Sequence, residues 1–366
     1  MKILYLGRNS FRQHKRGGEN VIDFQSKTFE FERVYYLHWG SKTTAYKNNK
    51  FACISIKHCW YWPLLLNLVL LKIKRENKFI THSHNELFSF FSVFKTDILT
   101  VHDGLFYLSR CYKHRLSFAF RIIEFLLYYR CSLVHFVSNY TKKQTLFGNR
   151  RNFVIIPNTS HFETLVPLCE LHQNKHNKSS ILIVRSIEER ARFNLLLQVA
   201  EQLREKEYMF TVAGKGPLLE HYQKEIKERK LKNIEMLGYV NDAELLHLYS
   251  NCDIVLMIAG YGEGFGLPII EGYLFNKPVI ASNVCAIPEV IIDNSFLFEN
   301  KVDDVIEKID FALSQVNRDY RKFYFEKFSN QNIISQFSQL YNTVYQNFPL
   351  LFKGGVSCPK GHDGVV

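Results

Sequence analysis

The most constraining feature of this chain is an eleven-residue segment that combines a glycine-rich turn, a helix start and two carboxylates. It reads Gly262-Glu263-Gly264-Phe265-Gly266-Leu267-Pro268-Ile269-Ile270-Glu271-Gly272. The run at 253–258, which is apolar after Asp253, predicts a buried parallel strand before it, and Pro268 is typical of the first position of a helix. A strand, a turn and a helix in this order point backbone N–H groups and a positive helix dipole at a crevice, which suits a diphosphate.

The side chains of this segment add the chemistry of sugar binding. Gly264 and Gly266 let a backbone approach a ligand closely. Glu263 is expected in the loop and Glu271 in the first turns of the helix, where both can accept hydrogen bonds from sugar hydroxyls. A carboxylate such as Glu271 can also simply stabilise a helix N-terminus. The segment predicts a sugar-nucleotide site, and the spacing of its carboxylates is not that of a metal site.

Length and composition indicate a two-domain globular protein. A chain of 366 residues exceeds one typical core, and 46% hydrophobic residues argue against disorder. The longest apolar run, residues 62–73, is too short to span a membrane and suits a buried helix better. The N-terminus lacks the pattern of a signal peptide, and the eight cysteines show no paired C-x-x-C spacing. We therefore expect a cytoplasmic protein with reduced thiols.

Alternating strand and helix patterns divide the chain into two wound α/β halves. The first half begins with a strand at residues 2–6 and a helix opened by Gly17-Gly18, and a polar stretch over 168–180 marks a linker. A second alternating set begins at Ile181. The expected boundaries are a first domain at 1–166, a linker at 167–180, a second domain at 181–332, a closing helix at 333–348 and a tail at 349–366.

Positive charge is concentrated in the first half. Residues 1–165 contain 25 Lys and Arg against 10 Asp and Glu, whereas residues 166–366 contain 22 against 25. No nucleic-acid-binding motif accompanies this charge, so nucleic acid is not an expected partner. Basic and aromatic residues alternate over 105–130, which is compatible with an anionic membrane surface. An ordinary helix with aromatic residues in the core and charges in solvent explains that stretch equally well.

Several motifs, in order, resemble those of the retaining GT-B glycosyltransferases of family 4. The segment from Glu263 to Glu271 resembles their E-x7-E motif. Other matching segments are Gly17-Gly18-Glu19, Thr100-Val101-His102-Asp103, Val137-Ser138-Asn139-Tyr140-Thr141, Ile155-Ile156-Pro157-Asn158, Ala213-Gly214-Lys215-Gly216-Pro217 and Leu237-Gly238-Tyr239-Val240. The resemblance covers nearly the whole chain to about residue 345 and implies a GT-B fold, with two Rossmann-like domains and a cleft between them.

The resemblance also implies roles for particular residues. Glu263 would contact the hydroxyls of the donor sugar, Glu271 would contact the ribose, and His102 would lie near the donor sugar, so that Glu263 and His102 are the catalytic candidates. The family uses an Arg and a Lys after the first strand of its second domain, whereas this chain keeps Arg185 but has Arg190 or Arg192 instead of the Lys. We expect Arg185 and Arg190 to bind the diphosphate, although an ion pair with Glu188 or Glu189 is the ordinary alternative. The remaining candidates are Gly214, Gly216, Gly264, Phe265, Gly266 and Leu267 for the donor, and Gly17 and Gly18 for the acceptor or diphosphate.

The function that the resemblance implies is transfer of a sugar from a UDP- or GDP-sugar to a hydroxyl of a glycan or lipid-linked glycan, in surface polysaccharide or lipopolysaccharide biosynthesis. Such an enzyme needs no metal or other cofactor and works in the cytoplasm, at the inner face of the membrane when its acceptor is a lipid. Two other functions stay open: a GT-B sugar-nucleotide epimerase and a catalytically silent protein that binds sugar nucleotides. A nicotinamide dehydrogenase is disfavoured because no G-x-G-x-x-G follows the first strand.

Overall fold

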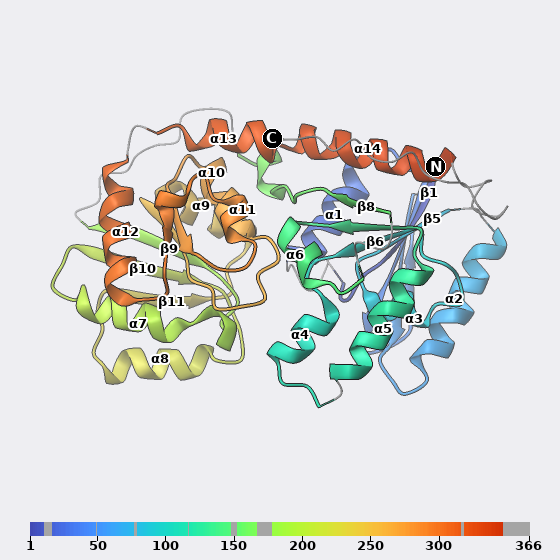
Figure 1. Cartoon of the computed structure of the whole chain (residues 1–366), viewed down its shortest axis with the longest axis horizontal. Coiled ribbons are helices and arrows are strands. Elements are labelled where there is room, and N and C mark those ends of the chain that lie inside the picture. The colour runs from blue at the N-terminus through green and yellow to red at the C-terminus, as the bar shows by residue number, and fades with distance from the viewer. Residues whose placement is uncertain are drawn as a thin grey trace.

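The computed structural model describes residues 1–10, 17–48, 50–76, 79–115, 117–147, 152–166, 178–315 and 318–346. Most of the expected linker, residues 167–177, and the whole expected tail at 349–366 lie outside the described residues. Two α/β domains lie side by side, and the last helix runs along the first of them (Figure 1).

The first domain is built on a sheet that has eight strands in the described part of the chain. Their order is β3-β4-β2-β1-β5-β6-β7-β8, and all pairs are parallel except β3 with β4. The strands are β1 (Lys2–Leu6), β2 (Arg33–Gly40), β3 (Thr44–Lys47), β4 (Phe51–Lys57), β5 (Ile80–Ser83), β6 (Ile98–Val101), β7 (Leu133–Phe136) and β8 (Phe153–Ile155). The helices are α1 (Gly17–Thr28), α2 (Trp62–Glu76), α3 (Glu86–Phe91), α4 (Leu105–Cys111), α5 (Ser117–Arg130), α6 (Asn139–Gln144) and the 3-10 turn η2 (His161–Thr164).

The second domain has a parallel sheet with six strands among the described residues, in the order β11-β10-β9-β12-β13-β14. The strands are β9 (Ser179–Val184), β10 (Tyr208–Ala213), β11 (Ile234–Gly238), β12 (Ile254–Met257), β13 (Val279–Ser282) and β14 (Leu297–Phe298). The helices and 3-10 turns are η3 (Glu189–Ala191), α7 (Phe193–Gln202), α8 (Leu219–Glu228), α9 (Asp242–Asn251), α10 (Leu267–Leu274), α11 (Ile287–Val290), η4 (Asn294–Phe296), α12 (Val302–Ser314) and α13 (Tyr320–Lys327). Parallel strands joined by helices are the doubly wound arrangement that the sequence pattern predicts.

The closing helix, α14 (Asn330–Gln346), follows α13 and packs against the first domain rather than the second. Its buried residues Phe337 and Tyr341 join the core that contains Tyr5 and Phe29. The hydroxyl groups of Tyr341 and Tyr5 lie 3.1 Å apart. Helix α14 therefore ties the chain's second half back to its first sheet.

Two predicted details differ from the structure. Helix α10 begins at Leu267, so Pro268 occupies its second position instead of the first. The apolar run at 62–73 forms α2, which is not a buried helix: Leu66, Leu70 and Ile73 face the core. Leu64 and Leu68 are more than half exposed. The run has apolar residues all round, and only one face of α2 meets the sheet, so the other face is left in solvent.

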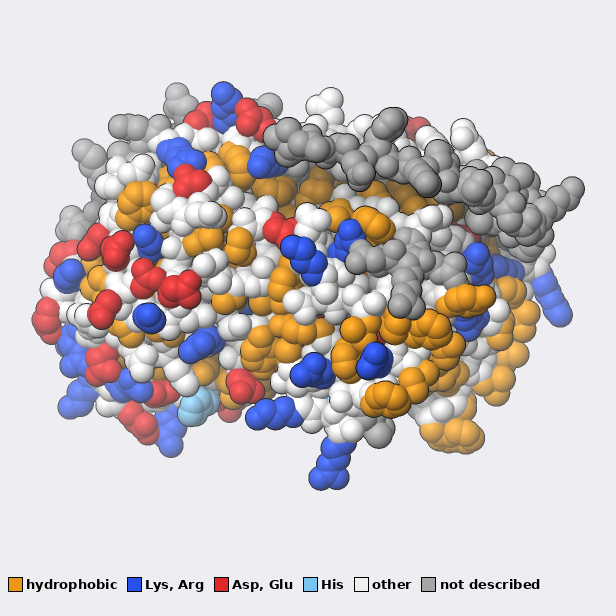
Figure 2. All heavy atoms as spheres, viewed as in Figure 1, with side chains coloured by type: hydrophobic (Ala, Val, Ile, Leu, Met, Phe, Trp, Pro, Cys, Tyr) orange, Lys and Arg blue, Asp and Glu red, His pale blue; other side chains and the backbone are white. Residues whose placement is uncertain are grey.

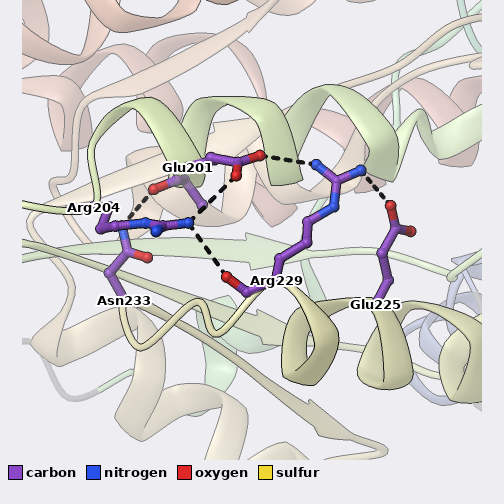
Figure 3. Close-up of polar contacts among 6 residues, drawn as sticks. Glu201, Arg204, Glu225, Arg229 and Asn233 are labelled. Atoms are coloured by element: carbon purple, nitrogen blue, oxygen red, sulfur yellow. Dashed lines mark hydrogen bonds and ion pairs between the residues drawn. The ribbon is translucent and has the colours of Figure 1, made fainter.

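The surface of the second domain carries a small network of ion pairs (Figure 3). Arg229, just after α8, pairs with Glu201 of α7 at 3.0 Å and with Glu225 at 2.5 Å. Arg204 also pairs with Glu201, at 3.3 Å, and donates to the Arg229 carbonyl oxygen. These contacts join α7 to α8 on the side of the sheet that they cover.

Candidate functional site

A cavity of about 520 Å³ lies between the two domains, where the strands of both sheets have their carboxyl ends. Ligands bind at this place in open α/β sheets. The first domain contributes loops after β1, β5 and β6 and the start of α1, and the second contributes the loop after β9 and the start of α10. We call this cavity the cleft.

Arg185 and Glu263 meet in the cleft across the two loops of the second domain. Arg185 follows β9, and its backbone N–H donates to the Ala213 carbonyl oxygen. One guanidinium nitrogen of Arg185 lies 3.0 Å from a carboxylate oxygen of Glu263, and both side chains are largely buried. The Nε of Arg185 is buried and has no hydrogen-bond partner among the described residues. An unpaired buried donor of this kind fits a cleft that receives an anionic group.

Arg190 lines the cleft from η3, whereas Arg192 is exposed and does not line it. Arg190 pairs with Glu188 at 3.4 Å, which is the ion pair named above as the ordinary alternative, and it also donates to the Gly262 carbonyl oxygen at 2.5 Å. Burial lowers the pKa of Arg190, but the nearby carboxylates of Glu263 and Glu188 outweigh it, so the net pKa is raised. The guanidinium is therefore charged at the cleft wall.

The glycine turn brings the two domains into direct contact. A Cβ atom on Gly264 would lie 1.9 Å from the carbonyl oxygen of His102, so only glycine fits here. Ser138, which caps α6, donates from its hydroxyl to the Gly264 carbonyl oxygen at 2.8 Å. Gly266 has a φ of 102° and stands at the N-cap of α10. Phe265, Gly266 and Leu267 line the cleft together with Gly264.

Glu271 lines the cleft from the second turn of α10 and is 6% exposed. Burial raises the pKa of its carboxyl to about 7, and the hydroxyl of Tyr249 donates to it at 2.7 Å. Tyr249, in α9, was not a sequence candidate. A tyrosine inside an amphipathic helix reads as a core residue, and no pattern in the sequence connects it to Glu271.

His102 follows β6, and its pKa is lowered to about 4 by burial, so the imidazole is neutral at physiological pH. Its Nε2 lies 3.1 Å from Nδ1 of His84. Asp103, beside it, has a pKa raised well above the usual range, first by burial and then by the negative charge of Glu263. His84 and Asp103 both line the cleft. Neither was a sequence candidate, although Asp103 lies within the quoted motif around His102.

The remaining predicted glycines divide into two groups. Gly18 lines the cleft near the start of α1, and a Cβ atom on it would lie 3.7 Å from Nε2 of His102; Gly17 is the first residue of the same helix. Gly214 and Gly216 are not among the cleft-lining residues. Their Cβ positions would overlap the carbonyl oxygens of Arg185 and Ile187, at 1.8 and 2.2 Å. These two glycines allow the loop after β10 to pack on the backbone that carries Arg185.

Comparison with known proteins agrees with this architecture. Residues 170–324 match the family model described as glycosyl transferases group 1. The chain is 27% identical over 182 residues to an uncharacterized 41.2 kDa protein in the cps region of Klebsiella pneumoniae, covering 48% of this chain and 49% of that protein. It is 41% identical over 73 residues to the O-antigen chain mannosyltransferase B of Escherichia coli, covering 20% of this chain and 19% of that protein. The chain thus spans at most about half the length of these two relatives.

Among solved structures, Anabaena Alr3699/HepE, crystallised in complex with UDP and glucose, superposes with a TM-score of 0.75 at 15% sequence identity. The superposition covers 93% of this chain and 99% of that one. At this identity the similarity shows the fold, which is the GT-B arrangement of two Rossmann-like domains. Within this fold, the segment 170–324 is similar to the glycosyl transferases group 1 family.

Proposed function

We propose that this protein is a retaining glycosyltransferase of the hexosyltransferase type. It moves a sugar from a UDP- or GDP-sugar to a hydroxyl of a glycan or lipid-linked glycan, in the biosynthesis of a surface polysaccharide or lipopolysaccharide. Relatives support this in a general way, since one of them is named as an O-antigen mannosyltransferase and the superposed HepE structure holds UDP and glucose.

The observation that carries the proposal is the convergence of charges at the start of α10. Arg185, Arg190, Glu263 and Glu271 all line one cleft, and the N-terminal end of α10 opens into it. Cations beside a helix N-terminus suit a diphosphate, and carboxylates suit the hydroxyls of sugars. In this arrangement Arg185 and Arg190 hold the diphosphate, Glu263 holds the donor sugar, and Glu271 accepts from the ribose.

Transfer requires the bond between the anomeric carbon and the diphosphate to break. The leaving diphosphate gains negative charge as this happens, and the guanidinium groups of Arg185 and Arg190 stabilise that charge in the transition state. The departing phosphate oxygen takes the proton of the attacking hydroxyl on the same face of the sugar. This step needs neither a protein nucleophile nor a bound cation, and the configuration at the anomeric carbon is retained.

The acceptor is proposed to reach the cleft from a membrane surface. No helix in the described residues is long and apolar enough to cross a membrane. Figure 2 shows hydrophobic side chains gathered over the lower part of the first domain, around α2, α4 and α5. Exposed apolar residues there are Leu64, Leu68, Leu71, Phe118, Ile122, Phe125, Leu126 and Tyr129. We call this set the apolar face.

Basic side chains accompany the apolar face. Lys113, Arg115 and Arg121 are exposed on or beside α4 and α5. Of the two explanations for residues 105–130, the exposure of Phe118 and Tyr129, each 67% exposed, supports the membrane surface. An anionic lipid surface would accept both kinds of side chain.

Sedimentation with lipid vesicles tests the membrane proposal. Binding to vesicles that contain anionic lipid should exceed binding to neutral vesicles, and Arg121→Glu should reduce it, by about 1 kcal/mol or more per charge changed. Lys224→Glu, on an exposed helix of the second domain, is the matched control and should bind as the wild type does. Equal binding to both vesicle types would contradict the proposal.

A thermal-shift panel of UDP-, GDP- and ADP-sugars tests the proposed donor, because a ligand that binds the native state raises the melting temperature. One nucleotide should stabilise the wild type, and Glu271→Ala should lose that shift. Transfer to a glycan acceptor, followed by NMR of the new linkage, should show the anomeric configuration of the donor. Interconversion of sugars without an acceptor would favour the epimerase, and binding without turnover would favour the silent protein.

A further inference from the structure

His84 and His102 form a pair of hydrogen-bonded imidazoles, tilted by 32° to each other, at the wall of the cleft. Their ring centroids are 5.3 Å apart, and Nδ1 of His84 is 3.1 Å from Nε2 of His102. Burial lowers the pKa of both groups, so neither imidazole is charged at neutral pH. Each ring then carries one proton, and a single hydrogen bond between them fixes where both protons lie.

Two arrangements satisfy this hydrogen bond. In the first, His84 donates from Nδ1–H to Nε2 of His102, which places the proton of His102 on Nδ1. In the second, His102 donates from Nε2–H, which places the proton of His84 on Nε2. The Nε2 of His84 is buried and has no partner among the described residues. A buried N–H without an acceptor is rarer in proteins than a buried acceptor without a donor, which favours the first arrangement.

Neighbouring residues hold His84 in the position from which its Nδ1–H can donate to His102. Its backbone N–H donates at 2.8 Å to the carbonyl oxygen of Leu6, the last residue of β1. Its ring packs on that of His82, with centroids 4.5 Å apart. Asn85 follows as the N-cap of α3 and donates to the Gly7 carbonyl oxygen. The imidazole of His84 therefore has little freedom to turn over and exchange its two nitrogens.

The neighbouring ring of His82 is fixed by a chain of hydrogen bonds that runs in one direction. His135 donates from Nε2 to the Ile156 carbonyl oxygen at 2.9 Å, so its Nδ1 accepts from the hydroxyl of Thr100. Thr100 in turn accepts from Nε2 of His82 at 2.6 Å, which leaves Nδ1 of His82 to accept from Tyr341. Every proton in this chain is determined by the one backbone oxygen at its end.

We propose that His84 is a positioning residue that donates to Nε2 of His102 and thereby keeps the proton of His102 on Nδ1. The inference rests on the proposed function and on the expectation that His102, which lines the cleft, lies near the donor sugar. His102 then offers an N–H donor to a ligand oxygen in the cleft, and it does not act there as a base through Nδ1. A ring held in this tautomer recognises a hydroxyl or carbonyl oxygen of the sugar by donating a hydrogen bond to it from Nδ1–H.

NMR of protein labelled with 15N in histidine tests the proposed tautomer directly. Each tautomer gives a distinct pattern of correlations between the ring nitrogens and the carbon-bound protons of the imidazole. The His102→Gln variant assigns the His102 signals by their loss. The wild type should show His102 protonated on Nδ1. His102 protonated on Nε2 in the wild type would overturn the proposal. The measurement uses ligand-free protein, so its result stands whether or not a nucleotide sugar binds.

Two variants of similar size separate the hydrogen bond from simple packing. Asparagine at position 84 places an amide N–H₂ about where Nδ1 lies, whereas glutamine places it about where Nε2 lies. His84→Asn should keep the tautomer of His102, and His84→Gln should lose it. Transfer activity should fall about 10-fold more in His84→Gln than in His84→Asn, mainly in kcat, by analogy with other outer partners of functional histidines.

The two variants also protect the test against misfolding. Tryptophan fluorescence reports the fold of the first domain, since all three tryptophans lie there. Equal tautomer populations of His102 in two folded variants would mean that packing, not the Nδ1–H of His84, sets the tautomer, and the proposal would fail. Absence of nucleotide binding with the expected tautomer in place would instead count against the proposed function alone.

Discussion

The two domains are built on similar sheets but have different interiors. Within the described residues, the second domain has one continuous apolar cluster, to which all six of its strands contribute. The buried side chains of the first domain divide into three apolar clusters, and a chain of polar groups from Tyr341 through His82, Thr100 and His135 passes through its sheet. The first domain's side of the cleft therefore holds buried neutral imidazoles beside the buried carboxyl of Asp103, whereas the second domain's side holds the buried carboxyl of Glu271.

Buried histidines and buried carboxyls should respond to pH in opposite directions. A histidine with a lowered native pKa takes up its proton at a higher pH in the unfolded state than in the native state. The free energy of unfolding therefore decreases as pH falls below about 6.5. A carboxyl with a raised native pKa keeps its proton in the native state, so stability is lost as pH rises from about 4.5 toward the native value. The buried histidines should therefore lower the stability of the first domain in acid, whereas the buried carboxyls of Glu271 and Asp103 should lower stability as pH rises.

The largest expected effect is acid unfolding of the first domain. The pKa values of His102 and His135 are each lowered to about 4 by burial. Each should cost up to about 3 kcal/mol of stability between pH 6.5 and pH 4. Trp39, Trp60 and Trp62 all lie in the first domain, so tryptophan fluorescence during urea unfolding follows this domain alone. Buried carboxyls of the same domain, among them Asp97 with a pKa raised to about 6, act in the opposite direction, so the test compares the wild type with His135→Gln. Equal changes of the urea midpoint between pH 7 and pH 5 in these two proteins would refute the assignment of a neutral buried His135.

The next effect is a trade between stability and binding at Glu271. The pKa of this carboxyl is raised to about 7 by burial, so the ligand-free protein loses on the order of 3 kcal/mol of stability as pH rises from about 4.5 to about 7. Glu271→Gln removes the charge and should raise the melting temperature at pH 8 but not at pH 4.5. The same variant should bind the nucleotide sugar about 10-fold more weakly, because a neutral amide is a weaker acceptor than a carboxylate. Equal stabilisation at both pH values would show that packing, not ionisation, is responsible.

A third prediction concerns the contact between the domains at Gly264. A methyl group there would overlap the His102 carbonyl oxygen, so Gly264→Ala should keep the domains from closing as they do here. We expect a loss of about 100-fold in kcat/KM, as misplacement of reacting groups by about 1 Å produces. Gly40→Ala is the matched control, because its crowding involves the Ser55 side chain and not a cleft residue. Activity that falls equally in both variants would point to general destabilisation.

The smallest expected effect lies on the surface of the second domain. Arg229→Ala removes the ion pairs with Glu201 and Glu225, whose side chains are between a fifth and a half exposed. Exposed pairs of this kind contribute little, so the free energy of unfolding should fall by less than about 1 kcal/mol. Tryptophan fluorescence should not register the change, whereas circular dichroism of the whole chain should.

The sequence predicts the fold well because its repeating strands and glycine turns are local signals. The segment around Gly264 and Glu271 indicates a strand, a turn and a helix, and the structure has β12, the turn and α10 there. The exposed face of α2 was not predicted, because periodicity cannot say which side of an apolar run meets the sheet. His84 was also missed: its role depends on β5 and β6 being neighbours, which only the folded sheet reveals. Tyr249 meets Glu271 for the same reason, through the packing of α9 beside α10.

Isothermal titration of nucleotide sugars tests the proposed donor site, with Arg185→Gln in the cleft and Arg229→Gln on the surface as its matched control. Both variants remove one positive charge, but only Arg185 faces the proposed diphosphate. We expect the wild type and Arg229→Gln to bind one UDP- or GDP-sugar with equal affinity, and Arg185→Gln to bind it at least about 10-fold more weakly. Equal affinity in all three proteins, or no binding of any nucleotide sugar to the wild type, would contradict the proposed donor site.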